Sequence, residues 1–449
     1  MRSLRLVGAF AAAFLLSMPL GFVSPLSATQ PQTADGDKAI IVLVHGLVLD
    51  LHQPNQIWGE PQKTGWSGMI GFLELKGLRF GGTIQPRLGR ASLPDCLNTS
   101  NTQGDPRTAA VYVVNFSKNG NVDGLAYRTA ELAECLEQLR NYTGARKVWI
   151  VAHSAGGVIT RAYLQNVVPR IRYQGDVERL ITIATPHLGS AAATYFGDLL
   201  GTRATCMKPN AGLIHDINGE LDLPRDVSYA SIVVRGLWRN VKGNGSGAYD
   251  KHIDRKLLDR LPLSYRMGGD ELLHCKTQNL WPTPTAVRYE KATGKPIQYV
   301  AVRVPRIAGD LIHTSAPLDA NVQEAVLTFL SPDGFLWTKD IAKERRTAWV
   351  QKQAADCAAS IVEQETWTLH SFSGVVGTKL SLKRNSGSDT QHSYRFEAET
   401  QWRGSIIGVK TGKCLVSGSM DLEVDSFGRI VGVRQTIDQR INLPKPGKK

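Results

Sequence analysis

The sequence has few of the features that mark a metal centre, a nucleic-acid module or a repeat architecture. Its 449 residues include only six cysteines, none in C-x-x-C spacing, and its aspartates and histidines are scattered, so no ligand cluster for a metal is indicated. The net charge is +13, but the basic residues are not interleaved with aromatic ones in a known recognition motif, so DNA or RNA binding is not predicted. No internal repeat is evident. With 42% hydrophobic and 21% charged residues, the composition is that of an ordinary globular protein, long enough for two domains.

Long hydrophobic runs are also missing, apart from one near the N-terminus. Arg2 and Arg5 form a basic start, Leu6 to Leu16 is apolar, and Ser27-Ala28 provides small residues for cleavage. This order predicts a signal peptide over residues 1–28 and therefore a secreted or periplasmic protein. The apolar run is short for a membrane span, and an uncleaved N-terminal anchor is the alternative. No cysteine follows closely, which argues against a lipoprotein anchor.

Export changes the interpretation of the cysteines. In an oxidising compartment an even number of scattered cysteines indicates disulfides rather than metal ligands, and free buried thiols are the alternative. The sequence alone does not determine how they pair. They are Cys96, Cys135, Cys206, Cys275, Cys357 and Cys414.

The positive charge is unevenly distributed. Basic residues gather between Arg225 and Arg266 and again at Lys445, Lys448 and Lys449. They would favour an anionic lipid or cell-envelope surface, or they simply form a solvated basic face.

Apolar runs alternate with helical patterns over the first three quarters of the chain. Uninterrupted apolar runs are expected of parallel strands covered on both faces, and helical patterns such as Arg128 to Arg140 and Asn321 to Leu330 separate them. The pattern predicts an α/β fold with a doubly wound, mostly parallel sheet over residues 36–331. The predicted strands are Ile40 to Val44, Val111 to Phe116, Val148 to Ala152, Leu180 to Ala184, Ala230 to Val234 and Tyr299 to Val304.

The pattern changes after a strong turn signal at Ser331-Pro332-Asp333-Gly334. Ile341 to Val362 is predicted to be a helix. From Trp367 onward apolar and polar residues alternate, as in Tyr394, Phe396 and Ala398. Period-two alternation indicates antiparallel strands with one buried face, so residues 335–449 are predicted to form a smaller C-terminal domain of a helix and an antiparallel β unit.

The most informative motif surrounds Ser154. Lys147 to Ala152 is a strand-like run, and Val158 to Gln165 has a helical pattern. A serine at a tight strand-to-helix turn becomes a nucleophile because the turn holds its hydroxyl above the sheet. Only small neighbours fit such a turn, and here they are Ala152 and Gly156.

Two further motifs follow apolar strands. His45-Gly46-Leu47 follows the strand that begins at Ala39, and Thr185-Pro186-His187-Leu188-Gly189-Ser190 follows the strand that begins at Leu180. Backbone N–H groups of Leu47 and Ala155 would form the pair of donors that stabilises a tetrahedral oxyanion. His187 is interpreted as a hydrogen-bonded loop residue and His153 as a packing residue.

The segments V-L-V-H-G-L, A-H-S-A-G-G and T-P-H-L-G-S, in this order, resemble the α/β-hydrolase superfamily, in particular its secreted bacterial lipase/esterase group, which is triacylglycerol lipase-like. The resemblance covers about residues 38–331. It implies a lid over the serine between Leu188 and Pro224, with a surface insertion as the alternative. It also implies a Cys206–Cys275 disulfide, which would leave the pairs Cys357–Cys414 and Cys96–Cys135.

The resemblance implies the chain order serine, acid, histidine. His313 is the predicted base, because it follows the last strand and precedes an apolar-patterned helix. His274 and His252 could serve as the base instead.

The acid is expected between the strands near Val233 and Val302. Asp270, in Gly268-Gly269-Asp270, resembles the family's G-D-x-x-V segment and would orient the base. Glu271 could replace it if the turn is shifted. Four aspartates elsewhere in this part of the chain are weaker candidates for the acid: Asp250, Asp254, Asp259 and Asp310.

The sequence therefore predicts a serine hydrolase that cleaves carboxylic esters, a lipase or esterase of acylglycerols, through Ser154, His313 and Asp270 with no cofactor and no metal. Its expected partners are a lipid or other ester substrate and a lipid–water interface or anionic envelope surface; the oligomeric state is not given. The competing hypotheses are an acyltransferase, thioesterase or polyester depolymerase with the same site, or a non-catalytic envelope-binding protein.

Overall fold

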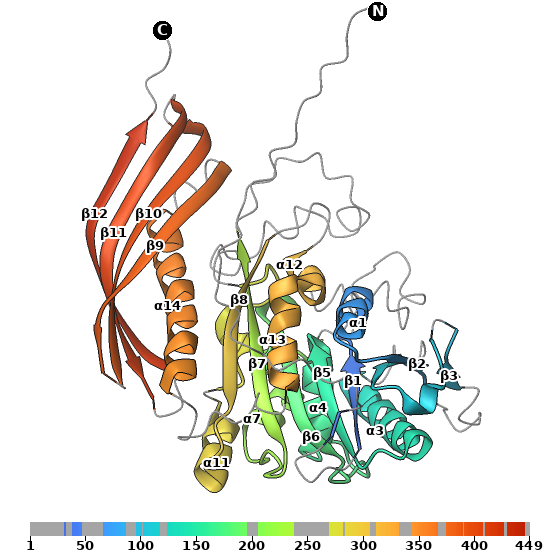
Figure 1. Cartoon of the computed structure of the whole chain (residues 1–449). Coiled ribbons are helices and arrows are strands. Elements are labelled where there is room, and N and C mark those ends of the chain that lie inside the picture. The colour runs from blue at the N-terminus through green and yellow to red at the C-terminus, as the bar shows by residue number, and fades with distance from the viewer. Residues whose placement is uncertain are drawn as a thin grey trace, which may run out of the picture.

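The chain contains two β-sheets, a larger one with helices on both faces and a smaller one packed against a single long helix (Figure 1). The computed structural model describes the following residues: 31–32, 38–46, 66–86, 96–100, 102–116, 124–194, 205–237, 269–281, 283–305, 311–331, 343–366, 374–388, 390–406, 409–425 and 429–444.

The larger sheet has eight strands in the order β3-β2-β4-β1-β5-β6-β7-β8, and only β3 runs antiparallel to its neighbour. Apolar runs form its centre because both faces are covered; every residue of β1 and β4 is buried. This confirms the predicted mostly parallel sheet. The strands are β1 (Ala39–Val44), β2 (Phe80–Ile84), β3 (Leu97–Asn98), β4 (Val111–Val114), β5 (Lys147–His153), β6 (Val177–Ile183), β7 (Ser228–Leu237) and β8 (Gln298–Pro305).

Helices cover both faces of this sheet and create two hydrophobic cores. One core holds alternate strand residues against α3 and α4, with Leu136 and Ile159 fully buried. The other core holds the opposite residues against α1 and α13, with Trp66 and Phe329 fully buried. The helices are α1 (Trp66–Leu75), α3 (Gly124–Thr143), α4 (Ala155–Leu164), α7 (Gly212–Asn218), α10 (Cys275–Gln278), α11 (Pro284–Thr293), α12 (Ile312–Ser315) and α13 (Ala320–Leu330).

The C-terminal part is a four-stranded antiparallel sheet, order β12-β11-β10-β9, with the long helix α14 (Lys343–Glu365) against it. Tyr394 and Phe396 of the sheet pack on Ala354 and Ala358 of the helix in a third core. Figure 1 shows α14 lying between this sheet and β8. The predicted antiparallel unit is thus confirmed. Its strands are β9 (Gly374–Gly387), β10 (Gln391–Ile406), β11 (Val409–Val424) and β12 (Ile430–Pro444).

The disulfide expectation is not supported. All six cysteines lie in described residues, and no disulfide joins any of them. Cys357 lies near Arg235 and Arg303 of the large sheet, whereas Cys414 lies near Glu365, two turns further along α14. A disulfide needs Cα atoms within about 7 Å of each other; Cys357 and Cys414 pack against the same core but lie beside different charged groups.

The segment predicted to be a signal peptide, residues 1–28, lies outside the described residues. None of the helices that are described is both long and apolar enough to cross a membrane.

Candidate active site

Ser154 occupies a strained turn between β5 and α4. Its φ is 55° and its ψ is −131°, which places a non-glycine residue at positive φ. Such strain persists only where the surrounding structure holds it. Two glycines allow the close packing that holds the turn. A Cβ on Gly46 would lie 2.5 Å from Ser154 Cβ, and one on Gly156 would lie 2.5 Å from Val44 O. The end of β1 is therefore packed backbone to backbone against the serine turn.

One of the two predicted oxyanion donors is described. Ala155 is the first residue of α4, where a helix offers its amides no intrahelical acceptor. The Ala155 N atom is also one of the atoms that a Cβ on Gly46 would meet, at 2.8 Å. The other predicted donor, Leu47, lies outside the described residues.

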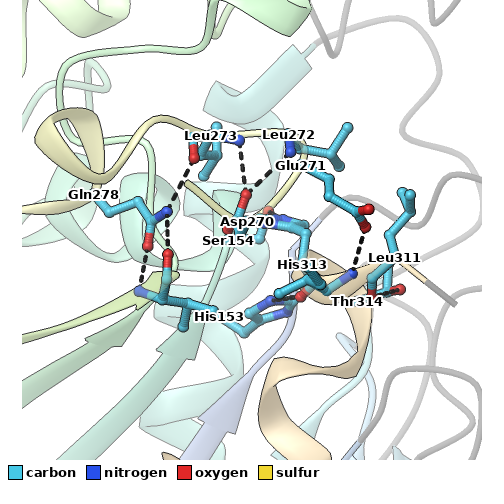
Figure 2. A network of polar contacts seen from close by, with 12 residues as sticks. His153, Ser154, Asp270, Glu271, Leu272, Leu273, Gln278, Leu311, His313 and Thr314 are labelled. Carbon is cyan, nitrogen blue, oxygen red and sulfur yellow. Dashed lines mark hydrogen bonds and ion pairs between the residues drawn. The ribbon is translucent and has the colours of Figure 1, made fainter. Parts of the chain in front are cut away.

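The structure brings Ser154, His313 and Asp270 together in one chain of hydrogen bonds. Ser154 Oγ lies 2.8 Å from His313 Nε2, and His313 Nδ1 lies 2.7 Å from Asp270 Oδ2. The carboxylate accepts from Nδ1–H, which leaves Nε2 as the acceptor of the serine proton. All three side chains are buried, and Asp270 is fully so. Figure 2 shows the three converging from separate segments.

The loop that carries Asp270 is held tightly to the end of β7. Asp270 Oδ1 accepts from the amides of Leu272 and Leu273, at 3.1 and 2.7 Å, so that Oδ2 remains for the histidine. The Gln278 side chain pairs with the backbone of Val234, accepting from its N–H at 2.7 Å and donating to its carbonyl at 3.1 Å. Gln278 also donates to Leu273 O, closing the network in Figure 2.

The backbone around His313 is held from three sides. Its own N–H donates to Asp270 O at 3.1 Å, and the N–H of Ile312 donates to Glu271 Oε2 at 2.9 Å. His153, next to the serine, lies with Nε2 2.9 Å from His313 O. Because a carbonyl only accepts, His153 carries its proton on Nε2. The loop that carries Asp270 and the serine turn thus both position His313.

The weaker candidates for acid and base lie elsewhere. His274 caps α10 and accepts from Lys276 N. Glu271 binds the Ile312 amide rather than the His313 ring. Five further candidates lie outside the described residues: Asp250, His252, Asp254, Asp259 and Asp310.

Sequence reasoning missed three supporting residues. His153 was interpreted as a packing residue, Glu271 as a substitute acid, and Gln278 was not considered. Each acts on backbone atoms of a segment distant in sequence, so local pattern gives no signal. Only the position of His153, directly before the serine, could have pointed to a role.

His187 belongs to a second buried network, next to α7. Arg161 Nη1 lies 3.4 Å from His187 Nδ1, and His187 Nε2 lies 3.0 Å from Thr182 Oγ1. Arg161 also donates to Asn218 Oδ1 at 3.1 Å and to Ile217 O. These contacts tie the segment after β6 to the helix that follows Ser154, which fits the loop role expected for His187.

Three buried histidines have lowered pKa values. Burial lowers the pKa of His45 to about 4. Burial, and then the neighbouring His313, lowers the pKa of His153 well below its usual value. Burial, and then the Arg161 charge, does the same for the pKa of His187. Among the described residues, no group of three or more His, Cys, Asp or Glu is arranged to hold a metal ion.

A family model described as alpha/beta hydrolase fold matches residues 40–212. The match spans less than half of the 449 residues, so this part of the chain is similar to the α/β-hydrolase fold. The resemblance drawn from the three sequence motifs is confirmed at this level, since the matched region contains all of them.

Known relatives add a lipase-like similarity over a shorter stretch. Triacylglycerol lipases of Pseudarthrobacter phenanthrenivorans and Burkholderia plantarii are each 38% identical to this chain over 97 residues, 22% of its length. The match spans 28% and 25% of those lipases, so the chain covers about a quarter of their length.

Solved structures with a similar fold are more distant. Phospholipase PlaB of Legionella pneumophila, in complex with thio-NAD, is 12% identical, with a TM-score of 0.44 and 89% of each chain covered. The mature lipase BlEst2 of Bacillus licheniformis is 17% identical, with a TM-score of 0.37, covering 68% of this chain and 95% of its own.

The packing at the serine turn predicts opposite effects for two helix glycines. Gly156→Ala should lower the free energy of unfolding by about 1–3 kcal/mol, because the new methyl group meets backbone oxygens that cannot move aside. Gly71→Ala, in α1 with open space around it, should raise it by about 0.5–1 kcal/mol. Urea unfolding of both variants measures this, and equal effects at the two positions would contradict the packing argument.

The buried histidines predict loss of stability in acid. Their folded pKa values lie below the unfolded value near 6.5, so the unfolded chain binds more protons between about pH 6.5 and 4. The free energy of unfolding should therefore fall as the pH drops through this window, by up to about 1.4 kcal/mol per pH unit for each histidine. Urea unfolding at pH 7, 6 and 5 measures the slope.

A pair of variants tests the source of this slope. His187→Gln should reduce the fall in the free energy of unfolding with decreasing pH. The control His215→Gln, at an exposed histidine, should leave that pH dependence unchanged. A slope that is the same in wild type and His187→Gln would assign the acid sensitivity to other groups.

Proposed function

We propose that this protein is a carboxylic ester hydrolase in which Ser154 is the nucleophile, His313 the base and Asp270 the acid that orients it. The observation that carries the proposal is the continuous chain from Ser154 Oγ through His313 to Asp270, with links of 2.8 and 2.7 Å. Nucleophile, base and orienting group within hydrogen-bond reach are the geometric signature of nucleophilic catalysis.

The geometry supports the usual order of proton transfers. His313 Nε2 takes the Ser154 proton as Oγ attacks the ester carbonyl, and the buried Asp270 stabilises the imidazolium that forms. His313 then gives the proton to the leaving alcohol, and water releases the acyl group by the reverse path. The Ala155 amide, at the start of α4, and the Leu47 amide would donate to the oxyanion.

We infer that the substrate is an acylglycerol or a related lipid ester. The support is the 38% identity to two triacylglycerol lipases over 97 residues. Acyl transfer, thioester hydrolysis and polyester cleavage would use the same residues, and no observed contact favours any of them. A panel of p-nitrophenyl esters of increasing chain length, with emulsified triglyceride, a thioester and a polyester beside it, identifies the preferred acyl donor.

Export remains a proposal from the sequence. The basic start, apolar run and small-residue site within residues 1–28 support secretion or a periplasmic location. Fractionation of expressing cells tests it, together with N-terminal sequencing of the exported protein. Recovery of the uncleaved chain from the cytoplasm would contradict it.

Ser154→Ala should abolish ester hydrolysis and labelling by a fluorophosphonate, while leaving the fold intact. Loss of a triad nucleophile costs about a million-fold in turnover elsewhere. Ser315→Ala is the matched control, because Ser315 is a buried serine beside the site whose Oγ donates to Ile312 O. A Ser154→Ala protein that is still labelled would show that another residue is the nucleophile.

Asp270→Asn and Glu271→Gln should differ sharply, although the two acids are adjacent. An amide at position 270 favours the wrong histidine tautomer, which lowered kcat about 10⁴-fold in a serine protease triad. Gln at position 271 keeps an oxygen that can accept from the Ile312 amide, so kcat should stay within about tenfold of wild type. Steady-state kinetics on a soluble ester compare them, and the reverse order would move the acid to Glu271.

A further inference from the structure

We propose that Asp356, in the C-terminal helix α14, is a positioning residue for the triad: it holds the ends of β7 and β8 together and thereby keeps the acid and base loops in register. The inference rests on the proposed function for its kinetic consequences. It rests on geometry alone for its structural ones.

The helix α14 presents different faces to its two neighbours. Its apolar residues Val350, Ala354 and Ala358 recur every four positions and pack in the core of the C-terminal sheet. Asp356 and Ser360 also lie four residues apart, and two residues along a helix reaches the opposite side, so this pair faces away from that core. Both contact arginines of the large sheet.

Those arginines are neighbours across the two last strands. Arg235 of β7 and Arg303 of β8 stand directly opposite in the parallel register, on strands about 4.8 Å apart. Asp356 lies between their charges, with Oδ2 3.3 Å from Arg235 Nη1 and Oδ1 3.0 Å from Arg303 Nε. Ser360 Oγ accepts from both arginines.

This ion cluster is mostly sheltered from solvent. The side chains of Asp356, Arg303 and Arg235 are 11%, 15% and 28% exposed. Partly buried charges are screened less than exposed ones. Without its carboxylate, residue 356 would no longer offset the repulsion between the two arginine charges near the ends of adjacent strands.

The last residues of β7 and β8 are linked to the segments that carry Asp270 and His313. Gly236, next to Arg235, donates its N–H to Gly269 O at 2.9 Å, and Gly269 precedes Asp270. β8 ends at Pro305 and precedes α12, which carries His313. The bond from His313 N to Asp270 O then joins the two loops. A change in the spacing of β7 and β8 would therefore move the acid relative to the base.

A second ionic contact joins the same two parts of the molecule at the opposite end of β8. Arg429 pairs with Glu290 of α11 and donates to Ile297 O, just before β8 begins. It also stacks on Trp281 at 4.6 Å. This contact contributes to the docking of the C-terminal part but lies away from the carboxyl ends of the strands, where the triad is. It therefore provides a matched control.

The test uses the full chain with Asp356→Asn, Asp356→Asn/Arg235→Gln and Glu290→Gln. Asp356→Asn should lower kcat on a soluble short-chain ester about tenfold or more with KM within about twofold, since small misplacements of catalytic groups are costly. Hydrogen exchange should speed up at the amides of Gly236 and His313. The double variant Asp356→Asn/Arg235→Gln should restore part of kcat and part of the protection of these amides, because it removes the repulsion between Arg235 and Arg303. Glu290→Gln should leave kcat and these two amides unchanged.

Two results would overturn the inference: unchanged exchange and kcat in Asp356→Asn, or the same changes in Glu290→Gln, which would indicate general undocking. If Asp356→Asn does not fold, Ser360→Ala removes the acceptor shared by both arginines and should give a smaller change in the same direction. A wild-type protein that neither hydrolyses esters nor reacts with a fluorophosphonate defeats the proposed function. Hydrogen exchange still decides the role of Asp356 in that case.

Discussion

The arrangement of the site depends on the close approach of backbone at the ends of β1 and β5. Ser154 holds a positive φ that a non-glycine residue adopts at a cost, and Gly46 and Gly156 are the positions where a side chain would collide with this turn. The strain persists because the two strands are buried at this end and in register through Val44 and Ala152. This turn therefore orients the serine hydroxyl, the first amides of α4 and the His153 ring.

Strands were predicted correctly from the sequence wherever one local pattern determined the structure. The apolar runs that became β1, β4 and β5 were visible because a parallel strand covered on both faces needs them. The strand β2 was not predicted, because its sequence FGGTI contains two glycines and no apolar run. Gly81 is nevertheless required there, since a Cβ would lie 2.4 Å from the Tyr112 ring.

The three residues of the candidate site were predictable from the sequence, but the contacts that hold them in place were not. Ser154, Asp270 and His313 follow from motif and chain order, and the structure brings them together. What holds them is tertiary: a histidine reaching a carbonyl 160 residues away, and a glutamine that pairs with the backbone of β7. The disulfide expectation is not supported for a related reason. Cysteine number and compartment say nothing about which thiols the fold brings within bonding distance.

Exposed sheet edges are a further constraint, because an unpaired edge strand can pair with another chain. The edges include β9 and β12 of the C-terminal sheet and β8 of the large sheet. β8 is partly shielded by α14, whose polar face binds it through Asp356. β9 and β12 instead carry exposed charged side chains, among them Lys379, Lys383 and Arg434, a common protection against edge-to-edge pairing. One helix therefore contacts two sheets: its apolar face completes the small core, and Asp356 and Ser360 on its polar face bind arginines of the last two strands of the large sheet.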